Sequence, residues 1–286
     1  MWRSWAEVMS GQSDTKTTDL RLGVIGVGVM GAALLRGLLE AGVVQPANVT
    51  AYDAEGPRLA EVAAELSIAA AKDNGALVQG ADVVLLAVKP QVLADVMTPL
   101  RGDWKPGQLL VSIAAGVPLE KLRMLTNDDL AVARVMPNVA CLVKAAASGV
   151  AYSETVSADQ KALVREMLGT VGVVVEVEEK LLDAVTGLSG SGPGFVALVI
   201  EALADGGVAA GLPRDKALAL AAQTVMGAGK YVLERGEDPA TLKDRVCSPG
   251  GTTIAGVRAL EANGLRSSLI EAVVRAAERS RDLGKS

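Results

Sequence analysis

Three glycines, at positions 26, 28 and 31, have the spacing Gly-x-Gly-x-x-Gly and separate two apolar segments. Residues 22–25 predict a short buried strand, and residues 32–39 predict a helix that starts at the third glycine. Glycines at this spacing allow a tight turn, a close approach of the backbone to a phosphate, and close packing of the helix on the strand. The helix N-terminus then faces the phosphate. The segment predicts a dinucleotide site that contains Gly26, Gly28, Val29, Met30 and Gly31.

A second predicted strand, residues 49–52, ends at an acidic residue, Asp53. In dinucleotide-binding folds an acid at this place accepts hydrogen bonds from the ribose hydroxyls and repels a 2′-phosphate, so Asp53 favours NADH over NADPH. Arg58 lies close in sequence and is able to receive a phosphate, which favours NADPH. A solvated turn residue is the other interpretation of Asp53. We expect NADPH or NADH as the cofactor, and these residues leave the choice open.

A second glycine-rich segment, residues 247–253, precedes a predicted helix over residues 254–262. The backbone N–H groups and the dipole at such a helix start attract an anion of the size of a carboxylate. The segment contains hydroxyl side chains at Ser248, Thr252 and Thr253, which add further hydrogen-bonding groups. The other interpretation is an ordinary helix cap with flexible glycines, and the residues alone support both equally.

The composition excludes several kinds of chemistry. The chain of 286 residues contains no histidine, which excludes Ser–His and Cys–His nucleophile pairs and imidazole metal ligands. Two cysteines, Cys141 and Cys247, are too few for a cysteine-based zinc site or a secreted disulfide scaffold, so we expect no metal and a cytoplasmic location. A net charge of −5 and an aromatic content of 2% argue against nucleic acid as a partner. A cofactor that carries its own hydride suits such a chain.

Strands and helices alternate from residue 20 to about residue 178, which predicts a Rossmann-type, doubly wound, mostly parallel sheet. Ligands of such sheets bind beyond the carboxyl ends of the strands. Three further predicted strands, over residues 81–88, 109–113 and 131–135, end in short loops. The residues there that we expect to contact the cofactor are Ala87, Val88, Lys89, Pro90, Ala115, Gly116, Pro137 and Asn138. For Lys89, a solvated loop lysine is an equally weighted alternative.

The predicted organisation has three parts. Residues 1–19 are polar and irregular and predict a disordered extension, residues 20–178 form the dinucleotide-binding domain, and residues 179–286 form an all-helical domain. The helices of the last part are apolar on most faces and need burial on several sides, so we expect a homodimer through them. Residues 184–200 carry no charge, but glycine, serine and proline interrupt them, and we expect no membrane span.

Six motifs together resemble the Δ1-pyrroline-5-carboxylate reductase family. They are Gly-Val-Gly-Val-Met-Gly at 26–31, Ala-Val-Lys-Pro at 87–90, Ser-Ile-Ala-Ala-Gly-Val at 112–117, Arg-Val-Met-Pro-Asn at 134–138, Ser-Gly-Ser-Gly-Pro at 189–193, and Leu-Lys-Asp-Arg-Val-Cys-Ser-Pro-Gly-Gly-Thr-Thr at 242–253. The last motif is the most specific, and the resemblance covers about residues 20–284.

The resemblance implies the last step of proline biosynthesis, in which a hydride from NADPH or NADH reduces the cyclic imine 1-pyrroline-5-carboxylate to L-proline. It also implies a homodimer whose partner chain completes the site, with dimers that can assemble further. The implied catalytic residue is Thr253, which meets the imine nitrogen, and the implied substrate-binding residues are Ser248, Gly250, Gly251, Thr252 and Thr253. Asp53 departs from the family, which usually lacks an acid there and often prefers NADPH.

Two alternatives remain from the sequence. A β-hydroxyacid dehydrogenase shares the glycine-rich opening and a helical second domain, but it needs a catalytic lysine on a helix after the sheet, and Lys180 and Lys230 are the only candidates. A nucleotide-sensing dimeric scaffold would keep the fold without the chemistry. The 248–253 segment weighs against the scaffold, because a sensor has no use for a carboxylate site.

Overall fold

The computed structural model of the chain describes residues 19–284. Residues 191–276 form one compact unit, the helical unit, and the residues on either side of that stretch form the other, the α/β unit. The extension predicted over residues 1–19 lies outside the described residues except for Asp19. The chain therefore passes from the α/β unit into the helical unit after residue 190 and returns after residue 276.

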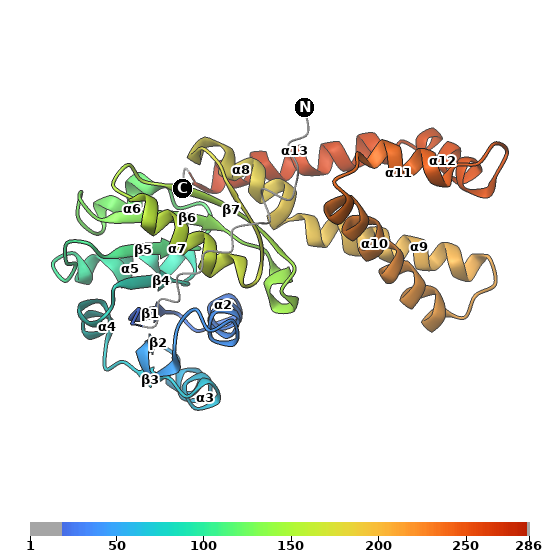
Figure 1. The fold of residues 1–286 in the computed structure, drawn as a ribbon. Helices are drawn as coiled ribbons and strands as arrows, with labels where there is room; N and C mark the ends of the chain where they lie inside the picture. Colours follow the sequence, from blue (N-terminus) through green and yellow to red (C-terminus); the bar gives the residue numbers. More distant parts are fainter. Residues whose placement is uncertain (1–18, 285–286) are drawn as a thin grey trace. The chain divides into compact units, whose positions relative to one another are not determined.

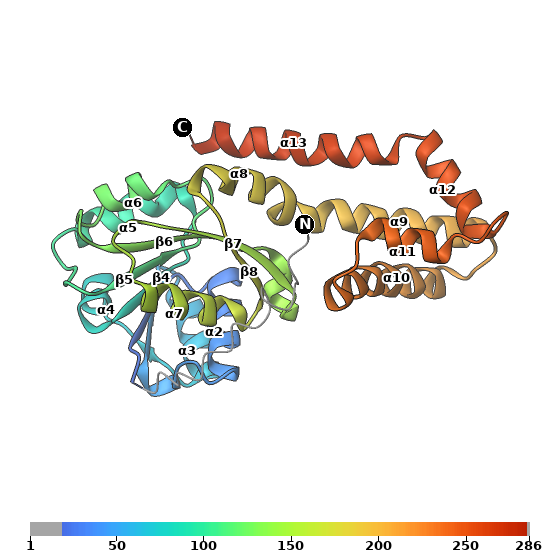
Figure 2. The same cartoon turned by 45° about the horizontal axis from the view of Figure 1, so that its top comes forward.

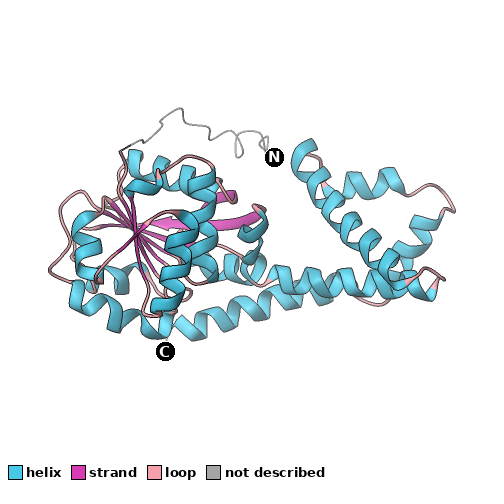
Figure 3. Ribbon diagram, turned by 90° about the horizontal axis from the view of Figure 1, so that it is seen from below, coloured by secondary structure: helices cyan, strands magenta, loops and turns pink. Residues whose placement is uncertain are grey.

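One eight-stranded sheet forms the centre of the α/β unit, with helices on both sides (Figure 3). The strand order is β3-β2-β1-β4-β5-β6-β7-β8, and every neighbouring pair is parallel except β6 and β7. The order reverses direction between β1 and β4, which is where doubly wound sheets bind ligands. The predicted mostly parallel α/β fold is confirmed. The strands are β1 (Leu22–Ile25), β2 (Val49–Tyr52), β3 (Ala69–Ala70), β4 (Val83–Leu86), β5 (Leu109–Ser112), β6 (Ala131–Met136), β7 (Ala146–Tyr152) and β8 (Gly172–Glu176).

Two hydrophobic layers cover the sheet, because its central strands are apolar on both faces. One layer contains α2 (Val29–Glu40), α3 (Gly56–Leu66) and α7 (Ala158–Gly169) (Figure 1). The other contains α4 (Asn74–Gly80), α5 (Leu93–Met97), α6 (Leu119–Met124) and α8 (Leu182–Val185). Short turns of helix connect these elements: η1 (Pro46–Asn48), η2 (Pro90–Val92), η3 (Thr98–Leu100), η4 (Val139–Val143), η5 (Glu179–Leu181) and the π-helical turn η6 (Thr186–Gly190).

The helical unit contains α9 (Gly192–Ala209), α10 (Arg214–Arg235), α11 (Pro239–Val246), α12 (Thr252–Ala262) and most of α13 (Leu265–Gly284) (Figure 2). Residues 189 and 190 belong to η6, and α9 begins at Gly192. Pro193 is tolerated there since the first N–H groups of a helix have no partner within the helix.

The helical unit buries little of its own apolar surface. Its small core consists of Ala204, Ala217 and Ala221, with Ile200 and Val208 packed against it. Many large apolar side chains stay exposed on the same helices, among them Leu198, Leu220, Met226, Leu260 and Ile270. Exposed apolar surface on this scale is typical of an interface with another chain.

One helical stretch among the described residues, 179–209, is long and apolar enough to cross a membrane by length and composition alone. Only 6% of its most apolar window is buried inside the chain. An apolar helix that pairs with a second chain passes the same test. The predicted absence of a membrane span therefore stays a prediction.

The last two turns of α13 belong to the α/β unit. Ala277 and Ser280 are buried, and the Ser280 hydroxyl donates a hydrogen bond of 2.6 Å to the Asp183 carboxylate on α8. The C-terminal end of the chain thus completes a unit that begins near its N-terminus.

Candidate active site

The glycine loop after β1 has the geometry of a phosphate-binding turn. Gly26 has a φ of 94°, and a Cβ there would lie 2.7 Å from the Ala87 carbonyl oxygen. A Cβ at Gly31 would lie 2.2 Å from the Gly26 carbonyl oxygen. These two glycines are required by the fold itself. A Cβ at Gly28 would meet no atom within 4 Å, so the space beside Gly28 is open to a ligand.

The N-terminus of α2 is free of side-chain caps. Gly28 is the N-cap, no side chain bonds to it, and the first turn contains no acidic residue. The predicted start of this helix at Gly31 was wrong, because the helix begins at Val29 and the third glycine packs inside its first turn. The first N–H groups and the positive end of the helix dipole are therefore available to an anion. These residues fit the pyrophosphate of a dinucleotide.

Asp53 connects the end of β2 to the glycine loop. Its Oδ2 accepts a hydrogen bond of 2.9 Å from the Val27 N–H, and its Oδ1 accepts one of 2.9 Å from the Glu55 N–H. The Asp53 side chain is 9% exposed, and Arg58 Nη1 lies 3.5 Å from Oδ2. Asp53 is therefore not a solvated turn residue. Arg58 also forms an ion pair with Glu55.

The ends of β4 and β5 lie at the same edge of the sheet as the glycine loop. A Cβ added to Gly26 would meet Val88 Cγ1 at 3.2 Å, and one added to Gly31 would meet Ala87 Cβ at 3.0 Å. Lys89 is exposed, and among the described residues no carboxylate forms an ion pair with it. Gly116, which follows β5, has a φ of 73°. The structure thus brings together the predicted cofactor residues of β1, β2 and β4 around one edge.

The end of β6 is more enclosed than predicted. Pro137 and Asn138 are both buried, and the Asn138 side chain bonds to its own chain at both polar ends. The pair of Arg134 and Glu179, which the sequence reasoning missed, lies close by: Glu179 Oε1 accepts hydrogen bonds from Arg134 Nη1 at 2.9 Å and from the Leu119 N–H at 2.6 Å. An arginine inside an otherwise apolar strand is the signal that could have revealed this pair.

The second predicted anion site lies in the helical unit, at the start of α12. The Gly251 N–H donates a hydrogen bond of 3.0 Å to the Ser248 carbonyl, and Gly250 has a φ of 68°. A Cβ at Gly251 would lie 2.3 Å from Ser248 Oγ, so a larger residue there requires the Ser248 side chain to turn away. Gly251 is the N-cap, and no side chain caps the helix. A glycine N-cap of this kind fits both interpretations of the segment, as an anion site and as an ordinary helix cap with flexible glycines, and both stay predictions.

Thr252 and Thr253 form the first turn of α12, two residues earlier than the predicted start at residue 254. Thr252 is exposed and Thr253 is half-buried. Their N–H groups are among those that a helix leaves without an internal partner. The turn therefore offers uncapped N–H groups with the Ser248, Thr252 and Thr253 hydroxyls beside them, which suits a carboxylate. This turn and the glycine loop belong to different compact units.

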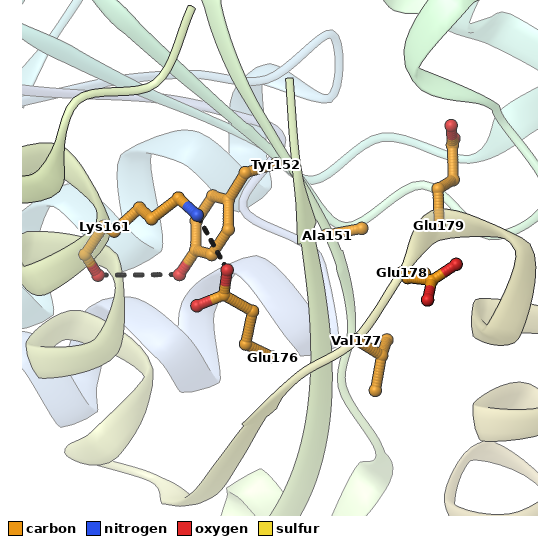
Figure 4. Close-up of a pocket in the computed structure, with 7 residues that line it drawn as sticks. All are labelled: Ala151, Tyr152, Lys161, Glu176, Val177, Glu178 and Glu179. Carbon is orange, nitrogen blue, oxygen red and sulfur yellow. Dashed lines mark hydrogen bonds and ion pairs between the residues drawn. The ribbon is translucent and has the colours of Figure 1, made fainter. Parts of the chain in front are cut away.

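A hollow of about 380 Å³ lies beside the end of β7 and contains none of the predicted site residues (Figure 4). Its polar groups are already paired: Lys161 Nζ lies 2.7 Å from Glu176 Oε1 and 4.8 Å from the centre of the Tyr152 ring. Burial raises the pKa of Tyr152 to about 12, with a further contribution from the charge of Glu176. No group of three or more potential metal ligands occurs among residues 19–284.

Comparison with known proteins identifies the family. Residues 179–283 match the pyrroline-5-carboxylate reductase dimerisation family, and residues 21–116 match the family of F420-dependent NADP oxidoreductases. A pyrroline-5-carboxylate reductase of Methanosarcina acetivorans is 47% identical over 265 residues, which cover 93% of this chain and 98% of that protein. The chain belongs to the pyrroline-5-carboxylate reductase family.

Solved structures of pyrroline-5-carboxylate reductases have the same fold. The structure of the Coxiella burnetii reductase aligns with a TM-score of 0.90 at 32% identity and covers 94% of this chain and 100% of that one. The Plasmodium falciparum reductase, whose structure has NADP bound, aligns with a TM-score of 0.81 at 30% identity, over 93% of this chain and 99% of that one. The α/β unit is thus an NADP-binding domain, and the helices after residue 179 include the dimerisation domain of the family.

Proposed function

We propose that this chain reduces 1-pyrroline-5-carboxylate to L-proline, the last step of proline biosynthesis, as a homodimer. The observation that carries the proposal is the uncapped start of α12, where hydroxyl groups surround free helix N–H groups in a chain of this family. The substrate has one carboxylate and one imine, and this turn offers groups that suit both. When bound, the reduced nicotinamide supplies the hydride that the imine carbon accepts.

The substrate carboxylate binds at the N-terminus of α12 in this proposal. Ser248 and Thr252 provide hydroxyl groups and Gly250 and Thr252 provide backbone N–H groups, while Gly251, whose N–H is bonded to the Ser248 carbonyl, is the N-cap. The helix dipole favours the negative charge. The positive φ of Gly250 and the close contact of Gly251 with Ser248 shape the turn. A rigid turn holds the ring in one orientation, and orientation accounts for much of the rate enhancement in such a reaction.

Thr253 is the proposed catalytic residue. Its hydroxyl hydrogen-bonds the imine nitrogen and orients the ring, while the nitrogen takes its proton from water. A threonine hydroxyl is a poor proton source, so its contribution is orientation and polarisation rather than acid catalysis. The substrate carbon is already electrophilic, and a strong acid is not needed.

The cofactor residues are proposed on the edge formed by the glycine loop and the ends of β4, β5 and β6. Gly28 leaves space for the phosphates, and the N–H groups of Val29, Met30 and Gly31 face them. The further proposed contacts are Gly26, Ala87, Val88, Lys89, Pro90, Ala115, Gly116 and Pro137. Asn138 was predicted in the same set, and its side chain is held by hydrogen bonds to Ala140 and Ser189.

We propose that both NADPH and NADH are used, with Asp53 and Arg58 acting in opposite directions. The Asp53 carboxylate disfavours a 2′-phosphate, and the neighbouring guanidinium of Arg58 attracts one. Because both oxygens of Asp53 already accept backbone N–H groups, Asp53 also holds the glycine loop. Dimers that assemble further and a cytoplasmic location stay predictions.

The hydroxyacid dehydrogenase alternative finds no support at its two candidate lysines. The Lys180 side chain is 74% exposed and pairs with Glu178, and the Lys230 side chain is 64% exposed and pairs with Glu234. Surface lysines in ion pairs of this kind are fully solvated rather than prepared for catalysis.

The test is the initial rate of cofactor oxidation by the purified protein with 1-pyrroline-5-carboxylate, run with NADPH and with NADH. Turnover with either cofactor, and L-proline as the product, is the expected result. A folded dimer that oxidises neither cofactor would overturn the proposal and would make 3-hydroxyacids the next substrates to examine.

A further inference from the structure

The side chain of Asn138 is held at both polar ends. Its Oδ1 accepts a hydrogen bond of 3.2 Å from the Ala140 N–H and so caps η4. Its Nδ2 donates a hydrogen bond of 3.0 Å to the Ser189 carbonyl, 51 residues later in the chain. Asn138 is 9% exposed. These two bonds use one of the two N–H groups and one of the two oxygen lone pairs, and they fix the orientation of the buried carboxamide.

Ser189 lies in η6, the π-helical turn that ends the first segment of the α/β unit. This turn packs directly on the end of β6, since a Cβ at Gly190 would lie 2.7 Å from Met136 Cε. One turn earlier, α8 packs on β7, where a Cβ at Gly149 would lie 2.7 Å from Val185 Cγ1. The two glycines let the segment approach the sheet closely, and the Asn138–Ser189 hydrogen bond fixes its end.

The Oδ1 end of the Asn138 side chain is connected through η4 to the glycine loop, where we propose that the cofactor binds. Asn138 caps η4, and Cys141 of η4 is buried with its Sγ 3.8 Å from the Sδ of Met30 on α2. Met30 is a residue of the glycine motif itself. Asn138 thus connects η4, which packs on the phosphate-binding helix, to η6, where the chain leaves the α/β unit.

We propose that Asn138 is a positioning residue for the reduction, and that its amide group acts by holding η6 on the end of β6. This inference rests on the proposed function. The hydrogen bond fixes the last turn before the chain enters the helical unit, which carries the Ser248–Thr253 turn. Asn138 touches neither the imine nor the nicotinamide in this role. Losing the Nδ2 donor therefore impairs use of the imine and leaves binding of the cofactor unchanged.

The test is the variant Asn138→Asp. Its carboxylate can still accept from the Ala140 N–H, but when ionised it cannot donate to Ser189. We expect kcat/KM for the imine to fall about tenfold at neutral pH, the loss typical of one buried hydrogen bond. The Kd of the reduced cofactor, measured by its fluorescence, should stay the same. Hydrogen exchange of the amides in residues 186–190 should become faster.

The pH profile separates this role from a general loss of structure. A carboxyl group that faces a carbonyl oxygen has a raised pKa, and once protonated it regains an O–H donor. The activity of Asn138→Asp relative to wild type should therefore rise as the pH falls towards about 5. A variant whose whole structure is destabilised would show no such recovery of activity at low pH.

Asn127→Asp makes the same chemical change in the loop after α6, outside the proposed site, and should leave kcat/KM unchanged. If Asn138→Asp does not fold, Asn138→Ser keeps an oxygen for the cap and is too short to reach Ser189. An unchanged kcat/KM, or a cofactor Kd weakened by the same factor as the activity, would overturn the inference. If wild type itself does not reduce the imine, the proposed function fails, and the exchange of residues 186–190 still decides whether Asn138 holds η6.

Discussion

The carboxylate of Asp53 accepts a hydrogen bond of 2.9 Å from the backbone N–H of Val27, and this bond joins the end of β2 to the glycine loop. The side chain predicted to select the cofactor therefore also shapes the loop that we propose binds the cofactor phosphates. Removing the charge of Asp53 changes the selection of the cofactor, and removing the whole side chain also removes the hydrogen bond to the loop. A test of cofactor choice therefore has to remove the charge and keep the hydrogen bond.

Asp53→Asn removes the charge and keeps one oxygen acceptor for the loop. We expect the ratio of kcat/KM for NADPH to that for NADH to rise about tenfold, because the repulsion of the 2′-phosphate is lost. Arg58→Ala should lower the same ratio. Both values come from initial rates at saturating imine. If neither substitution changes the ratio, the adenosine ribose does not lie near these residues.

Gly26 and Gly28 should respond differently to alanine. Gly26→Ala places a Cβ 2.7 Å from the Ala87 carbonyl oxygen at a positive φ, so it should destabilise the chain by about 1–2 kcal/mol or more. Gly28→Ala meets no atom within 4 Å and should leave the stability unchanged while it weakens cofactor binding. Thermal unfolding and cofactor titration of both variants measure the two effects. Equal cofactor affinity in Gly28→Ala and wild type would contradict the phosphate site.

Thr253→Ala should lower kcat by about 10²-fold, the loss that follows removal of one hydrogen-bond donor to a reacting group, with little change in cofactor Kd. Thr253→Ser retains a hydroxyl and should recover most of the activity. The measurement is steady-state kinetics with both substrates varied. An alanine variant that turns over like wild type would remove Thr253 from the mechanism.

The Tyr152 hydroxyl should lose its proton at a higher pH than the hydroxyl of a solvated tyrosine. Burial raises its pKa to about 12, so the difference in ultraviolet absorbance between wild type and Tyr152→Phe should show a midpoint there. Because the folded pKa lies above the unfolded one, the resulting stabilisation is present below about pH 10 and is lost as the pH rises to about 12. A midpoint near 10 would show that the ring is accessible to water.

The stability of the helical unit should depend on protein concentration. Its exposed apolar residues need a second chain to cover them, so dilution should lower Tm. Ile270→Glu, on the exposed face of α13, should shift the protein towards monomer in light scattering, whereas Glu271→Gln beside it should not. A monomeric wild type would contradict the dimer.

The sequence predicted the sheet well because each central strand is a short apolar run between turn residues. The starts of the helices were predicted less accurately than the strands. Helix α12 begins at Thr252 because the Gly251 N–H bonds to the Ser248 carbonyl and forms a turn there, and the spacing of the residues does not show this bond. Helix α11 was missed although Asp238 caps it and Pro239 occupies its first turn, a start signal visible in the sequence.

The site was predictable where local backbone geometry defines it and not where distant residues meet. The spacing of the glycines at 26, 28 and 31 is enough by itself to predict a phosphate-binding turn. The hydrogen bond from Asn138 to Ser189 joins residues 51 positions apart, and the one from Val27 to Asp53 joins residues 26 positions apart. No local sequence pattern shows which distant residue such a side chain will hydrogen-bond.

The return of α13 to the α/β unit has a consequence for synthesis of the protein in the cell. Ala277 and Ser280 are buried in a unit whose first strand begins at Leu22, so nearly the whole described chain separates two parts of one unit. A ribosome makes the N-terminal strands first, and the residues that finish their unit are made only after the whole helical unit. The nascent α/β unit therefore stays incomplete, with Asp183 still unpaired with Ser280, until the last turns of α13 have left the ribosome.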